Sequence, residues 1–206
     1  AMSPSVALTL LGAALLVGLP HGALDHVIAE RSRAWRGKWG QVWFHASYLT
    51  AVAAVLLGWW LVPGPTLLLF LLVAVWHFGE TDFLHVDGDA QRASVVLSRG
   101  LMIVFGAIHA SPEAAIQLLE VASATDVERQ LPLARSGGLW VPLALWAVHV
   151  RVLWGVLGRG SQFSEATADA TALALLITGA GPLIAFPLYF IVCHTPDHVT
   201  ALIDRS

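Results

Sequence analysis

The chain alternates between long apolar segments and short polar connections. Seven segments each approach the roughly 20 residues that a helix needs to cross the hydrocarbon core of a bilayer. They are residues 4–28, 41–62, 65–84, 93–111, 138–157, 165–182 and 183–203. This pattern predicts an all-α fold, a polytopic membrane helix bundle with about seven transmembrane helices. We interpret residues 1–206 as a single integral-membrane domain.

The connections between these segments are marked by glycine and proline. VPGP at 62–65 separates the second segment from the third, and GAGP at 179–182 separates the sixth from the seventh. The longest connection, 112–137, has the spacing of a short amphipathic helix lying on the membrane. No small-residue cleavage site follows the first segment, so we expect a membrane helix there and not a signal peptide.

Composition agrees with a membrane protein. Charged residues make up 12% of the chain, about half of the roughly 25% typical of soluble domains. The formal net charge is −3 and no basic run occurs, so we expect no nucleic-acid partner. Cys193 is the single cysteine, which excludes an intrachain disulfide.

Basic residues predict the orientation of the bundle. One set of connections holds Arg31, Arg33, Arg36, Lys38, Arg92, Arg159 and Arg205, and the opposite set holds Arg129 and Arg135. Basic residues concentrate on the cytoplasmic side. We therefore expect a multi-pass protein of the cell (inner) membrane with its C-terminus in the cytoplasm.

Polar residues interrupt the apolar segments in three short motifs. These are GLPHGALDH at 18–26, WHFGETD at 76–82 and CHTPDH at 193–198. In the predicted topology, the motifs lie at a similar depth in the cytoplasmic half. Ionisable groups inside a membrane are costly and are candidates for function by default.

The histidines of these motifs predict a metal site. The candidate ligands are His21, His77, His194 and His198. His194 and His198 are four residues apart, so one face of a helix could present both imidazoles to one metal. Gly79 would let a helix or a ligand approach closely. Imidazole ligation suits iron, copper or zinc, and a polar network that ties helices together is the alternative.

Carboxylates lie about one helical turn from the candidate ligands. A histidine that binds metal usually donates its second N–H to an acceptor of this kind. We predict supporting roles for Asp25, His26, Glu80, Glu165 and Asp197. Glu165, which follows Ser164 and begins the sixth segment, is equally well explained as a helix cap. We expect structural or interfacial roles for His109 and His149, and packing for Cys193.

Together the motifs resemble the Brp/Blh family of membrane β-carotene 15,15′-dioxygenases. The resemblance also covers the stretch from Glu165 through PLIAFPLYF, and the motifs occur in the family's order. It implies a non-haem Fe²⁺ site with His21, His77, His194 and His198 as ligands and catalytic centre. The implied reaction uses O₂ to cleave β-carotene, or a related polyene, centrally into retinal-type aldehydes. The expected partners are the carotenoid, O₂ and the lipid bilayer, and protein partners are left open.

Two departures from the family pattern leave the substrate open. The chain is shorter than expected for the family, and the last motif reads HTPDH where the family usually has serine after the first histidine. Neither departure removes a ligand.

Other functions are compatible with parts of the pattern. Membrane di-iron lipid hydroxylases and desaturases share the short histidine spacings, but no two histidines are adjacent here. A non-catalytic metal- or pigment-binding membrane protein is a further alternative. A retinal-binding rhodopsin is excluded because Lys38, the single lysine, lies in the first connection.

Overall fold

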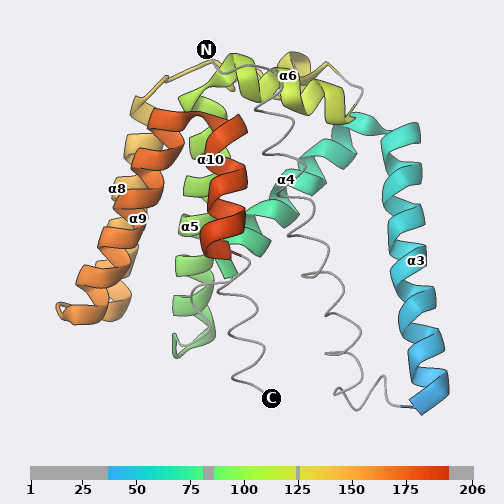
Figure 1. Cartoon of the computed structure of the whole chain (residues 1–206), viewed down its shortest axis with the longest axis horizontal. Coiled ribbons are helices and arrows are strands. Elements are labelled where there is room, and N and C mark those ends of the chain that lie inside the picture. Colours follow the sequence, from blue (N-terminus) through green and yellow to red (C-terminus); the bar gives the residue numbers. More distant parts are fainter. Residues whose placement is uncertain (1–36, 81–85, 124–125, 195–206) are drawn as a thin grey trace.

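The computed structural model describes residues 37–80, 86–123 and 126–194 (Figure 1). Within these ranges the chain is helical and contains no strand, which confirms the all-α prediction. The helices are α3 (Gly37–Leu61), α4 (Pro63–Glu80), α5 (Asp89–Ala110), α6 (Pro112–Ser123), α7 (Val127–Gln130), α8 (Trp140–Leu157), α9 (Ser161–Ala180) and α10 (Pro182–Tyr189), followed by the π-helical turn η2 (Phe190–His194). The first predicted segment, 4–28, lies outside the described residues.

Four of the described helices are long and apolar enough to cross a membrane. They are α3, α4, α5 and α8, and they match the predicted segments 41–62, 65–84, 93–111 and 138–157. The segments 165–182 and 183–203 also contain helices. However, α9 is rich in alanine and threonine, and α10 has only 8 residues. The protein is therefore a membrane helix bundle, and the count of seven spans remains a prediction.

The antiparallel helices α4 and α5 approach each other through two glycines. A Cβ atom on Gly79 would overlap the backbone carbonyl of Val96, and one on Gly100 would overlap the carbonyl of Val75. Small residues allow such close backbone contact between membrane helices. The expectation that Gly79 admits a close neighbour is confirmed, and the neighbour is α5.

Helix α5 lies at the centre of the described bundle, with α4 on one side and α8 and α9 on the other (Figure 1). One core cluster joins α4, α5 and α6 around Leu67, Leu71, Ile108 and Ile116. A second cluster joins α5, α9 and α10 around Met102, Ile103, Leu173, Ile177 and Tyr189. The helix predicted within 112–137 is α6, which lies across one end of the bundle.

Helix α3 lies at the periphery of the described bundle. A single residue, Val62, separates it from α4, and none of its 25 residues is buried. Trp39 and Trp60 are 78% and 79% exposed. Apolar surface of this extent fits contact with lipid better than contact with water.

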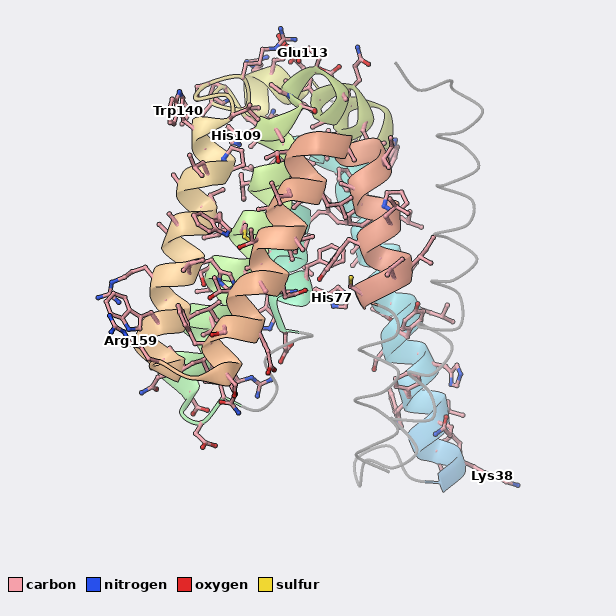
Figure 2. The ribbon with its side chains drawn as sticks, turned by 60° about the vertical axis from the view of Figure 1, so that its left-hand side comes forward. Lys38, His77, His109, Glu113, Trp140 and Arg159 are labelled. Carbon is pink, nitrogen blue, oxygen red and sulfur yellow. The ribbon has the colours of Figure 1, made fainter. Side chains whose placement is uncertain are left out.

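The basic residues are divided between the two ends of the bundle as in the predicted topology. Lys38 and Arg159 lie near one end (Figure 2), and Arg92 lies in the first turn of α5, which begins at the same end (Figure 1). Arg129 in α7 and Arg135 belong to the segment between α6 and α8, at the other end. Which end faces the cytoplasm remains a prediction.

We predict that Gly100→Ala destabilises the bundle by about 1–3 kcal/mol, the usual cost of overpacking. The added methyl group would have to displace the α4 backbone, because no flexible side chain there can yield. The thermal unfolding midpoint in detergent measures the loss.

Gly179→Ala is the matched control, because nothing lies within 4 Å of the position of its Cβ atom. This change should leave stability unaltered or raise it by up to about 1 kcal/mol through helix propensity. Equal stability of Gly100→Ala and the wild type would contradict the close contact.

Candidate functional site

His77 lies near the C-terminal end of α4, with its side chain exposed. The next residue, Phe78, contacts two rings of α10: Phe186 at a centroid distance of 5.3 Å and Tyr189 at 6.2 Å. Helix α10 continues directly into η2, which ends at His194. The fold thus brings His77 and the backbone of His194 to the same part of the bundle, and Figure 2 shows His77 beside the end of α10.

The remaining predicted ligands and three supporting residues fall outside what the structure describes. His21, Asp25, His26, Asp197 and His198 lie outside the described residues, as does the side chain of His194. Within the described ranges, no group of three or more His, Cys, Asp or Glu residues could hold a metal ion. The four-histidine site therefore stays a prediction.

The end of α10 departs from the continuous helix predicted for 183–203. Pro187 lies inside α10 and has no N–H to donate to the preceding turn. The N–H of Phe190 bonds to the carbonyls of both Phe186 and Pro187, and the wider η2 follows. Short π-helical turns of this kind are frequent at functional sites.

An aromatic cluster, formed by Phe78, Phe186, Tyr189 and Phe190, lies beside His77. Phe186 stacks on Phe190 at 6.1 Å and meets Phe78 edge-on at 90°. Tyr189 is buried, whereas Phe186 remains 40% exposed. The cluster fixes the end of α4 against α10 and leaves an accessible aromatic surface next to the imidazole.

Glu80 connects the end of α4 to the start of α5. One carboxylate oxygen accepts a hydrogen bond from Arg92 Nη2 at 2.7 Å, and the other accepts one from Trp76 Nε1 at 3.2 Å. A carboxylate is unfavourable at a helix C-terminus, and the charge of Arg92 offsets this cost. The predicted role of Glu80 in supporting His77 remains a prediction.

The prediction that Glu165 begins a helix is wrong. Helix α9 begins at Ser161 with Gly160 as its N-cap, so Glu165 lies in the second turn and is exposed. Ser164 is not a cap either, because its Oγ donates to the Gly160 carbonyl at 3.2 Å. The apolar pattern missed this start because the first turn of α9 is polar.

Two polar pairs that the sequence interpretation missed join α5 to α8 and α9. Arg99, only 2% exposed, forms an ion pair with Asp169 on α9 at 2.9 Å. Ser98 Oγ on α5 lies 2.9 Å from His149 Nδ1 on α8. Arg99 lies within the apolar segment 93–111. A charged residue inside such a segment is costly to bury, and this is the sequence signal that could have predicted a partner for Arg99.

The structural roles expected for two other histidines are confirmed. His149 is buried between α5 and α8. His109 lies 2.8 Å from the carbonyl of Phe105 and 3.2 Å from that of Leu133, so it connects α5 to the segment before α8. Cys193 packs against the second core cluster, as expected.

Fold and site define an all-helical membrane protein that presents a histidine beside an aromatic surface. The sequence model of the β-carotene 15,15′-dioxygenase family matches residues 12–206. The chain belongs to this family, which confirms the resemblance noted from its motifs.

Two curated proteins illustrate the relationship. A β-carotene 15,15′-dioxygenase from an uncultured marine bacterium is 26% identical over 195 residues, which cover 89% of this chain and 65% of the relative. A probable β-carotene 15,15′-dioxygenase Blh from Halobacterium salinarum is 26% identical, with 94% and 61% of the two chains covered. The chain thus spans slightly less than two thirds of the length of either relative. No solved structure matches it.

We predict that Asp169→Asn destabilises the protein by about 1.5 kcal/mol, the lower end of the range for hydrogen bonds to charged groups. The buried guanidinium of Arg99 would lose an anionic partner, and the effect is moderated because Asp169 is 53% exposed. A thermal unfolding midpoint lower by a few degrees would reveal the loss.

Glu128→Gln is the control, since the pair between Glu128 and Arg135 is exposed on both sides. Exposed pairs contribute about 0–1 kcal/mol, so little change is expected. A control variant as unstable as Asp169→Asn would argue against a special role for the buried pair.

Proposed function

We propose that the protein cleaves β-carotene, or a related polyene, at its central double bond in an O₂-dependent reaction that yields retinal-type aldehydes. The observation that carries the proposal is the family match across residues 12–206, which includes all three histidine motifs in order. The accessible aromatic surface beside His77 gives further support. The alternative of a di-iron hydroxylase has no comparable support.

The proposed cofactor is Fe²⁺, held by His21, His77, His194 and His198. Neutral imidazoles fit iron chemically, and His77 is exposed near the end of α4, beside the aromatic cluster. When bound, the metal supplies the centre that activates O₂. Asp25, His26, Glu80, Glu165 and Asp197 are proposed to support the ligands by accepting or relaying hydrogen bonds.

The proposed reaction breaks one carbon–carbon double bond and forms two carbonyl groups. Each carbon of that bond gains one oxygen atom from O₂, so both oxygen atoms enter the two aldehydes. No protein nucleophile or proton donor is required by this balance. The chain's contribution is to position the polyene and to keep water away from it.

The proposed substrate site adjoins the aromatic cluster. A carotenoid dissolves only in the bilayer, and the cluster offers ring faces to a flat conjugated chain beside His77. Phe186 is the most accessible member of the cluster and contacts both Phe78 and Phe190.

We place the reaction in the cell (inner) membrane, with the metal site in the cytoplasmic half of the bundle and the C-terminus in the cytoplasm.

We predict that wild-type protein in detergent, loaded anaerobically with Fe²⁺ and given β-carotene, releases retinal when air is admitted. His77→Ala should lose both bound iron and product, because it removes a proposed ligand. His45→Ala is the matched control, since His45 is exposed on peripheral α3 and its Nδ1 bonds to the Gln41 carbonyl. Chromatography with mass detection identifies the products, and metal analysis measures the iron.

The outcomes separate the parts of this proposal. Longer apocarotenals would contradict central cleavage but not the dioxygenase activity. Wild-type protein with stoichiometric iron and no product would overturn β-carotene as substrate. An active, iron-replete His77→Ala variant would remove His77 from the ligand set.

We also predict that Phe186→Ala raises KM for β-carotene about two- to tenfold, since one aromatic contact contributes about 0.5–1.5 kcal/mol. Phe70→Ala is the control: Phe70 lies two turns before His77 on α4, is 52% exposed and contacts Trp59. Steady-state rates at several substrate concentrations measure the effect. Equal KM values for the two variants would count against a substrate surface at Phe186.

A further inference from the structure

Two arginines converge on one tryptophan at the end of α8. The guanidinium carbon of Arg151 lies 5.4 Å from the centroid of the Trp154 ring, and that of Arg159 also lies 5.4 Å from it. Figure 2 shows Arg159 on the outer side of the bundle, at the end of α8 opposite Trp140. We propose that Arg151, Trp154 and Arg159 bind the phosphate group of an anionic phospholipid.

The side chain of Arg151 reaches along α8 toward the end of the bundle. A Cβ atom placed on Gly155 would lie 3.5 Å from Arg151 Nη1, so the guanidinium extends about one turn beyond its own backbone. A long basic side chain within an apolar helix extends in this way to bring its charge to the membrane surface. The absence of a side chain at Gly155 leaves room for it.

Arg159 reaches the same ring from the opposite direction. Gly158 ends α8 with φ +69°, a left-handed conformation that favours glycine. Its N–H bonds to the carbonyl of Trp154 at 3.1 Å, which fixes the turn. The backbone therefore holds the residue after Gly158 close to Trp154, and both guanidinium groups lie near the same ring.

The local charge favours an anion. Two guanidinium groups near one ring repel each other, and the ring offers each only a weak cation–π attraction at an exposed position. Within the described ranges, neither arginine forms an ion pair with a carboxylate, and Asp169 of neighbouring α9 is engaged by Arg99. A phosphate between or beside the two groups would relieve the repulsion.

The position of the site identifies a lipid as the occupant. Trp154 is 46% exposed on a helix that is apolar enough to span a membrane, and tryptophan with arginine is typical of the membrane–water interface. An exposed stripe on the same face continues along α8 through Ala147 to Leu143, in the first turn of the helix. Acyl chains can lie along this stripe while the phosphate meets the arginines. A zwitterionic lipid would also bring a positive group, which the two arginines disfavour.

The test compares the lipids bound to the 206-residue protein by native mass spectrometry in detergent. With equal phosphatidylglycerol and phosphatidylcholine, wild-type protein should retain phosphatidylglycerol roughly thirtyfold more, as expected for two surface arginines that each contribute about 1 kcal/mol. The double variant Arg151→Gln/Arg159→Gln should lose this preference. Arg135→Gln should keep it, because Arg135 lies near the opposite end and is paired with Glu128.

Three results would overturn the proposal. One is equal retention of the two lipids by the wild type, and another is an unchanged preference in the double variant. The third is release of phosphatidylglycerol by millimolar inorganic phosphate, which would indicate a site for free phosphate instead. If circular dichroism shows that the double variant is unfolded, the lipid preference of the single variant Arg159→Gln is measured instead. Arg159 lies beyond the end of α8, so its replacement should not disturb the helix. The outcome does not depend on any carotenoid activity.

Discussion

The close backbone contact between α4 and α5 is the constraint on which the candidate site depends. Helices in a membrane gain little from burying apolar surface, so dispersion at short range and polar contacts must hold them together. Gly79 and Gly100 make that short range possible at two levels, one turn apart. In each contact, the glycine of one helix meets a backbone carbonyl of the other. The two contacts therefore fix both the position of α4 along its own axis and its rotation about that axis, relative to α5. The direction in which His77 projects follows from them.

Helix α5 combines this close-packed face with a polar face toward α8 and α9. Ser98 and Arg99 lie between Val96 and Gly100, so the polar pairs stand at the same level as His77. The ion pair adds little net stability, because burial removes Arg99 from water while Asp169 remains 53% exposed. Its value here is specificity: only one arrangement of α5 against α9 brings Arg99 to Asp169. We interpret the polar layer as the element that holds α5 in place while α4 presents its histidine.

The sequence predicted the helices far better than the contacts between them. Long apolar runs identified α3, α4, α5 and α8, because lipid imposes a length and a composition on a spanning helix. Where that constraint weakens, the prediction failed. The polar first turn of α9 hid the start of the helix, and periodicity does not reveal the π-helical turn that follows Pro187. The pairing of Arg99 with Asp169 required knowledge of which helices are neighbours. The motifs identified the family, but their spacing alone did not show that α10 approaches His77.

The glycine contacts also determine at which positions evolution can insert or delete residues. The register of α4 against α5 is set by residues within the two helices, so the connection between them can gain or lose residues without moving His77. The window from Val75 to Gly79 has no such freedom. One residue inserted there would turn the histidine by about 100° around the helix axis relative to the glycine that anchors it. Insertions and deletions in this family should therefore be tolerated in the connection and excluded from those five positions.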